Sequence, residues 1–136
     1  MDWNRIIRLN EELIPEAEFR LEQAYAIATR CTASMSGMPG GGPSASVQEK
    51  AADQIERRKE ELMALRYELD VLRAEATAII AVLPEEKKRR VMTLRYLDGL
   101  SSGDIALRLG VTRRYVNRLL LQGMRESNTN EVPTVS

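Results

Sequence analysis

Residues 100–120, LSSGDIALRLGVTRRYVNRLL, hold four arginines, all of them from Arg108 to Arg118. An arginine can donate two hydrogen bonds to the edge of guanine, and Asn117 in the same stretch offers the matching pair for adenine. These residue types also bind DNA phosphates. The stretch therefore predicts a nucleic-acid-binding surface, if the local structure presents these side chains on one side.

The residues around the arginines predict a helix, a turn and a second helix. Ser101 with Asp104 three positions later resembles a capping box that starts a short helix, and Gly110 ends that helix. Thr112 is a good N-cap for the second helix, whose apolar residues lie three and four apart: Val116, Leu119 and Leu120. Two helices joined by a three-residue turn with a glycine have the spacing of a helix-turn-helix.

In a helix-turn-helix, the first turns of the second helix enter the major groove. The residues expected to face the bases are Arg113, Arg114, Asn117 and Arg118. Tyr115 is expected either to pack or to contact phosphate. Phosphate contacts are also expected from flanking residues, namely Lys87, Lys88, Arg89, Arg90, Ser101 and Arg108. A solvated charged face is the alternative, and the position of the arginines on the outward side of the corner disfavours it.

The composition limits the classes of function. Of 136 residues, 43% are apolar and only 4% are aromatic, which favours aliphatic helix packing and an all-α fold. With no histidine and with Cys31 as the only cysteine, neither a zinc site nor a histidine-based catalytic triad is expected. The glycines at 40–42 lack the Gly-Lys-Ser/Thr of a phosphate-binding loop. We expect neither catalysis nor a bound cofactor.

The charges are balanced overall but unevenly distributed. Residues 1–83 hold 10 Lys and Arg against 14 Asp and Glu, whereas residues 84–126 hold 10 against 5, a net charge of +5. This asymmetry predicts an assembly region joined to a nucleic-acid-binding region. No run of about 18 apolar residues and no apolar signal core are present, so we expect a cytoplasmic protein without membrane contact.

The first domain is expected to span residues 1–83 and to be a helical hairpin or oligomerisation region. Apolar periodicity predicts a helix over residues 1–30, which Pro15 should kink or divide. The Gly-, Ser- and Pro-rich residues 31–46 predict a flexible linker. A long helix is expected to follow over residues 47–83.

The second domain is expected to span residues 84–126 and to contain the corner. Pro84 is a good first residue for its opening helix, and Gly99 is a good terminator. The inward side chains of that helix are expected to be Val91, Leu94 and Leu97. Residues 127–136 are polar and predict a flexible tail.

The long helix repeats apolar residues at the a and d positions of a heptad: Ile55, Leu62, Leu65, Leu69, Leu72, Ala76, Ile79 and Leu83. In a parallel homodimer, the flanking charges would pair Glu61 with Arg66 and Glu68 with Arg73 of the other chain. Each exposed pair would contribute less than about 1 kcal/mol, so the pairs would select the partner more than stabilise it. The alternative is a hairpin with the first helix of the same chain, and a four-helix dimer would combine both.

The stretch LPEEKKRRVMTLRYLDGLSSGDIALRLGVTRRYVNRLLLQGMRE, residues 83–126, resembles region 4 of the sigma-70 class of bacterial RNA polymerase sigma factors. The shared order is Leu-Arg-Tyr, Asp-Gly-Leu-Ser, Ile-Ala and Leu-Gly-Val-Thr. The family commonly has an acidic residue where this chain has Arg114, so its target would differ from an ordinary promoter element. The resemblance implies that the second helix reads promoter DNA through Thr112, Arg113, Arg114, Tyr115, Asn117 and Arg118.

The whole chain resembles small phage and prophage proteins of Gram-positive bacteria that are related to phage late-gene transcription activators. The resemblance rests on the N-terminal helix, the connector SMSGMPGGGPS at 34–44, the long charged helix and the region-4-like end. It implies DNA binding and transcriptional control in a bacterial host cell. No promoter-melting region 2 is visible, so a working sigma factor is not expected.

Three functions stay open on the sequence. The leading one is a dimeric regulator of transcription that binds specific double-stranded DNA. The second is a phage DNA-packaging subunit of the small-terminase kind, although in those proteins the DNA-binding unit usually precedes the oligomerisation helices. The third is an appropriation factor that binds bacterial RNA polymerase.

Overall fold

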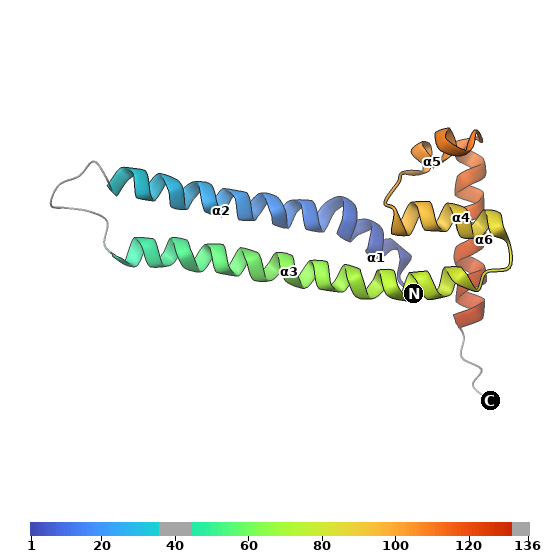
Figure 1. Cartoon of the computed structure of the whole chain (residues 1–136), viewed down its shortest axis with the longest axis horizontal. Helices are drawn as coiled ribbons and strands as arrows, with labels where there is room; N and C mark the ends of the chain where they lie inside the picture. The colour runs from blue at the N-terminus through green and yellow to red at the C-terminus, as the bar shows by residue number, and fades with distance from the viewer. Residues whose placement is uncertain (36–44, 132–136) are drawn as a thin grey trace, which may run out of the picture. The chain divides into compact units, whose positions relative to one another are not determined.

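The structure is a computed structural model that describes residues 1–35 and 45–131, and these residues form helices and no strand. The predicted all-α fold is confirmed. The chain divides into two compact units, one of residues 11–67 and one of residues 1–10 with the residues from Glu68 onward. In chain order the helices and π-helical turns are α1 (Trp3–Arg8), η1 (Leu9–Leu13), α2 (Ile14–Met35), α3 (Ala45–Ala81), α4 (Glu86–Met92), η2 (Thr93–Leu97), α5 (Ser102–Leu109) and α6 (Arg113–Glu131) (Figure 1).

Residues 11–67 form the hairpin unit, in which α2 and the first part of α3 run side by side in opposite directions (Figure 1). Arg66 lies 3.9 Å from Glu18 across the two helices, and the ammonium of Lys59 lies 5.9 Å from the centre of the Tyr25 ring. The buried side chains come from both helices: Ile14, Ala17, Ala24 and Leu62. The intrachain hairpin alternative is therefore present.

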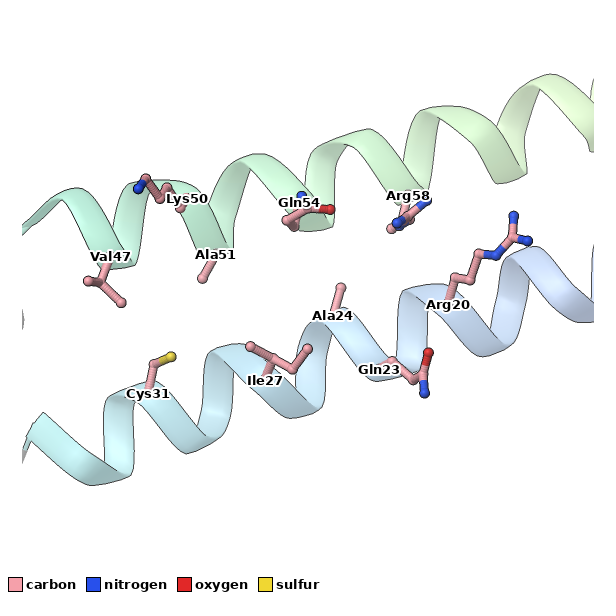
Figure 2. Close-up of a pocket in the computed structure, with 10 residues that line it drawn as sticks. All are labelled: Arg20, Gln23, Ala24, Ile27, Cys31, Val47, Lys50, Ala51, Gln54 and Arg58. Atoms are coloured by element: carbon pink, nitrogen blue, oxygen red, sulfur yellow. The ribbon is translucent and has the colours of Figure 1, made fainter.

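The interior of the hairpin unit is incompletely filled. A hollow of about 310 Å³ lies between α2 and α3 (Figure 2). Ala24 and Ala51 point into it from opposite helices, and the half-exposed thiol of Cys31 is also part of its lining. Single methyl groups leave this space open, unlike the large aliphatic pairs of a regular coiled coil. The hairpin is therefore loosely packed at this level.

The charged residues predicted to pair across a dimer have partners within the chain. Glu61 binds Arg58 at 3.1 Å, and Glu68 accepts two hydrogen bonds from Arg5, at 2.5 and 2.8 Å. Arg73 donates a hydrogen bond of 2.6 Å to a backbone carbonyl of η2. These contacts account for the charges without a second chain, so the dimer stays a prediction. Of the heptad residues, four are buried (Leu62, Leu69, Ala76 and Leu83) and four are partly exposed (Ile55, Leu65, Leu72 and Ile79).

The break expected at Pro15 is present. Helix α2 begins at Ile14, directly after the π-helical turn η1. Proline has no N–H, and its ring clashes with the carbonyl four residues earlier, here that of Glu11. A π-helical turn widens the backbone at this point. The chain can therefore pass Pro15 and continue as helix.

The predicted linker and tail are shorter than expected. Helix α2 extends to Met35 and α3 begins at Ala45, so both ends of the predicted linker are helical. Residues 36–44, the rest of that linker, lie outside the described residues. Helix α6 continues to Glu131, because Ser127 is buried and its hydroxyl donates to a backbone carbonyl of the preceding turn. The remainder of the predicted tail also lies outside the described residues.

The second unit, which we call the composite unit, includes α1 in its core. The rings of Trp3 and Tyr96 lie 4.8 Å apart with their planes inclined by 48°. Ile6 and Leu9 are fully buried with them. Burial raises the pKa of the Tyr96 hydroxyl above its usual value. The first ten residues thus share a unit with the corner, whereas the sequence assigned them to a domain of residues 1–83.

Helix α4 starts later than predicted and changes register. Its first residue is Glu86, so Pro84 lies before the helix and not at its first position. The π-helical turn η2 then shifts which side chains face inward. Val91 is buried as expected, but the next buried positions are Met92 and Tyr96, and the predicted inward residues Leu94 and Leu97 are only partly buried.

Candidate nucleic-acid interface

The corner between α5 and α6 has a side-chain cap at the start of each helix. The Ser101 hydroxyl accepts a hydrogen bond from the Asp104 amide at 3.1 Å, and the Thr112 hydroxyl accepts one from the Tyr115 amide at 3.1 Å. Gly110 ends α5 with φ of 68°, a conformation that strains residues with a side chain. The two predicted N-caps and the terminating glycine are confirmed. Three residues join the helices, which is helix-turn-helix geometry.

The crossing of α5 and α6 is fixed by one small and one branched side chain. Ala106 is buried, and its carbonyl accepts a hydrogen bond from the Val111 amide at 3.0 Å. Val116 is fully buried. The other buried side chains of the corner are Ile105, Leu119 and Leu120. Because this face of α6 is buried, its opposite face points away from the core.

Arg114 and Arg118 occupy that outward face, four residues apart and therefore one above the other. Arg113 and Asn117 are exposed too and are also four residues apart, so they lie one above the other on the flank of that face, each about 100° from the arginine that follows it. Three guanidinium groups and an amide are thus presented on the exposed side of α6. These are the donors that the sequence predicted for base edges.

A hollow of about 570 Å³ is lined by residues for which the sequence predicted two separate roles, contact with phosphates and reading of bases. Lys87 and Arg90 of α4 line it together with Thr112 and Tyr115 at the start of α6. Lys87 and Arg90 are exposed, and Tyr115 is half-buried. The apolar part of the lining is Val91, Leu109, Val111 and Leu119. Two cations of α4 are therefore adjacent to the proposed reading helix.

The structure corrects the phosphate contact predicted for Lys88. Its side chain is buried, with the residue only 5% exposed, and its ammonium binds the carboxylates of Glu126 and Glu85. These hydrogen bonds, first the one that Lys88 donates to Glu126, raise the pKa of Lys88. Arg89 is partly exposed and donates to the Leu83 carbonyl. Lys88 therefore holds α4 to α6, because its charge is already paired inside the unit.

The other predicted phosphate contacts stay predictions. Arg108 is exposed in the last turn of α5. Ser101 is exposed, and its hydroxyl already caps α5. A hydroxyl that accepts from an amide can still donate its own proton, so the cap leaves a phosphate contact open.

The close approach of α4 and α6 depends on a glycine that the sequence reasoning did not single out. Gly123 is buried in α6, and a methyl group added there would overlap the sulfur of Met92. The Tyr96 hydroxyl donates to the sulfur of Met124 at 3.2 Å on the same helix. A glycine inside a helical apolar pattern was the available signal for this contact. The pairing of Lys88 with Glu126 had no such signal, because 38 residues separate the two.

This part of the chain consists of a helix, a short turn and a capped second helix with outward arginines. It is therefore a helix-turn-helix. Residues 73–126 match the family described as Sigma-70, region 4. The chain therefore carries a region-4-like domain, which belongs to a class of DNA-binding domains. Neither the curated proteins nor the solved structures include a significant match to this chain.

In the part of the chain that the structure describes, no helix is long and apolar enough to cross a lipid bilayer. No group of three or more His, Cys, Asp or Glu side chains there is arranged to hold a metal ion.

Proposed function

We propose that this protein is a regulator of transcription that binds specific double-stranded DNA through α6. The observation that carries the proposal is the exposed pair Arg114 and Arg118 on the outward face of a region-4-like corner. A charged surface alone would be weak support, because most charged surfaces are only solvated. Here the arginines lie where a helix-turn-helix meets the major groove.

The proposed complex divides its contacts between bases and phosphates. Arg114 and Arg118 donate to guanine edges, and Asn117 pairs with adenine. Lys87, Arg90 and Arg108 contact phosphates at the flanks of the groove. Affinity should therefore fall steeply with salt, whereas the preference for one sequence should depend on α6.

We also propose that the protein acts as a homodimer through its hairpin unit. The hairpin leaves large apolar side chains exposed that a second copy would cover, namely Phe19, Tyr25, Ile27, Met63 and Tyr67. Two copies of the corner would then read two half-sites, and the operator would be an inverted repeat. The role in phage or prophage late-gene activation rests on the resemblance of the whole sequence to that family.

Binding to bacterial RNA polymerase is a second proposal, favoured by the region 4 match. It is compatible with DNA binding, since one module can carry both surfaces. Retention of the protein on immobilised, purified polymerase in the absence of DNA would support it. Retention equal to that on an unrelated protein of similar charge would argue against it.

Selection of bound fragments from sheared phage and host DNA tests the main proposal. The full chain is used at about 150 mM salt, where nonspecific phosphate binding is weakened. The expected result is strong enrichment of one sequence upstream of an operon. Arg114→Ala should abolish the enrichment. Arg57→Ala, which removes an equally exposed arginine from the hairpin unit, should leave it intact.

Diffuse recovery of all fragments would contradict a sequence-specific regulator. Diffuse, salt-sensitive recovery combined with a large ring-shaped assembly would favour the packaging role. Equal enrichment by wild-type protein and by Arg114→Ala would show that the DNA sequence is read by a surface other than this face of α6.

A further inference from the structure

One contact distinguishes Arg118 from the other exposed arginines at the start of α6. Its guanidinium carbon lies 5.2 Å from the centre of the Tyr115 ring. That is within the range of about 6 Å for a cation–π interaction. Among the described residues, the side chains of Arg113 and Arg114 make no hydrogen bond, ion pair or ring contact. Arg118 is therefore the arginine of this group whose direction is set before DNA arrives.

The Tyr115 ring can serve as a support because it is itself held in place. Its backbone amide is bound to the Thr112 hydroxyl, which fixes the first turn of α6. Its side chain is half-buried and lines the hollow between α4 and α6, together with Val91 and Leu119. Arg118 follows three residues later, where helical side chains are neighbours. The Tyr115 side chain contacts the composite unit, and the guanidinium of Arg118 lies over its ring.

We propose that Tyr115 is a positioning residue that orients Arg118 to read a guanine, so that this pair sets a G·C preference at one position of the operator. The inference rests on the proposed function and names the base class that one side chain reads. A guanidinium must present its planar fork to guanine to donate two hydrogen bonds. A contact between the guanidinium and an aromatic ring narrows the directions in which that fork can point.

The physical benefit is a smaller loss of freedom on binding. A solvent-exposed arginine samples many rotamers, and ordering one of them on DNA weakens the complex. An arginine already held over a ring loses less. From the usual strength of an exposed cation–π contact, we expect Tyr115 to change the preference for guanine by about two- to fivefold.

Competition binding with the full chain tests this role. The preferred duplex is selected from a random pool, and each base pair is then substituted in turn. Arg118→Ala identifies the position at which the preference disappears. Tyr115→Leu should lower the preference at that same position by about two- to fivefold and leave the other positions unchanged. Tyr115→Phe keeps the ring and should restore it.

Three outcomes would overturn the inference. An equal loss on every duplex with Tyr115→Leu would make Tyr115 a phosphate contact. The same loss with Tyr115→Phe as with Tyr115→Leu would mean that the hydroxyl touches DNA. An unchanged preference with Tyr115→Leu would show that Arg118 needs no support. If the wild-type protein selects no sequence at all, the proposed function fails first.

A measurement without DNA distinguishes failure of the positioning role of Tyr115 from failure of the proposed function. In the free protein, a ring above the guanidinium should shift the Arg118 side-chain resonances upfield in the NMR spectrum. Tyr115→Phe should keep the shift and Tyr115→Leu should remove it, while thermal unfolding monitors that the variants stay folded. Unshifted Arg118 resonances in the wild-type protein would overturn the positioning role whatever the DNA results are.

Discussion

Lys87 and Lys88 are sequence neighbours with the same charge and different surroundings. Lys87 is exposed at the hollow beside α6, whereas Lys88 is buried against Glu126 and Glu85. A run of four cations reads as one patch in the sequence. The helix separates it into residues that face solvent and a residue that faces the core, because successive side chains point about 100° apart.

Replacing Lys88 with Met should lower the melting temperature more than replacing Lys87 with Met, because the first change leaves partly buried Glu126, one of whose carboxylate oxygens is inaccessible to solvent, without its cation. The pKa of Lys88 is raised above its usual 10.5, so its contribution to stability is present below that pH and is lost as the pH rises through the raised pKa. The difference between wild type and Lys88→Met should shrink above about pH 10.5. Thermal unfolding by circular dichroism at a series of pH values checks this. A difference that stays constant from neutral to alkaline pH would contradict the assignment.

Gly123 is expected to resist even a methyl group. The added carbon would overlap the Met92 sulfur and lie 3.2 Å from its γ-carbon, in a site where Met92 is fully buried. Overpacking costs about 1–3 kcal/mol, against a gain of up to about 1 kcal/mol in helix propensity. Gly123→Ala should therefore destabilise the protein in urea unfolding. Gly103→Ala in α5 is the control, and it should be neutral or stabilising, since nothing but Ser101 at 3.9 Å is near. A stabilising Gly123→Ala would show that α4 and α6 are farther apart.

At the scale of elements, α1 belongs with the corner although almost the whole chain separates them in sequence. The Trp3 ring packs against that of Tyr96, and Arg5 binds Glu68 through two hydrogen bonds. The hydrogen bonds from Arg5 lower the pKa of Glu68 below its usual 4.5. This helix supports η2, which precedes the corner directly. Helix α1 therefore stabilises the DNA-binding unit, although it lies outside the residues that match region 4.

Trp3→Ala should therefore destabilise the composite unit by about 3–5 kcal/mol, the usual cost of removing a buried large aromatic side chain. Trp3→Phe should cost much less, because it keeps a ring against Tyr96 and removes an indole N–H that has no partner within the described residues. Chemical unfolding followed by circular dichroism measures both. Leu107→Ala, at a residue 84% exposed, is the control and should change stability by less than about 0.5 kcal/mol. A Trp3→Ala variant as stable as this control would separate α1 from the core.

The parts of the fold that the sequence could predict depend on local signals. Ser101, Gly110 and Thr112 each act on backbone within three or four residues, so the corner and its outward arginines were predictable. Contacts between distant segments were not, such as Arg5 with Glu68, 63 residues apart. The π-helical turn η2 was also invisible, and it moved the inward positions from Leu94 and Leu97 to neighbouring residues.

The heptad pattern of α3 has two explanations, an intrachain hairpin and a homodimer, and these predict different masses for the molecule in solution. The hairpin unit uses α2 as the partner of α3 and still exposes Met63 and Tyr67 on α3, at 68% and 72%. A homodimer would give a solution mass of about twice the 15.4 kDa of one chain, in sedimentation equilibrium at micromolar concentration. Met63→Glu with Tyr67→Glu should then return the mass to that of one chain. A single-chain mass for the wild-type protein at all concentrations would contradict the proposed dimer.

Competition binding shows whether α6 reads a DNA sequence. The full chain is titrated against its selected duplex and against a scrambled duplex of the same composition, over a range of salt concentrations. The selected duplex should bind about a thousandfold tighter or more. Arg114→Ala should lose most of this ratio, whereas Lys87→Ala should weaken both duplexes alike and reduce the salt dependence. Equal affinity for the two duplexes at every salt concentration would show that α6 does not read a sequence.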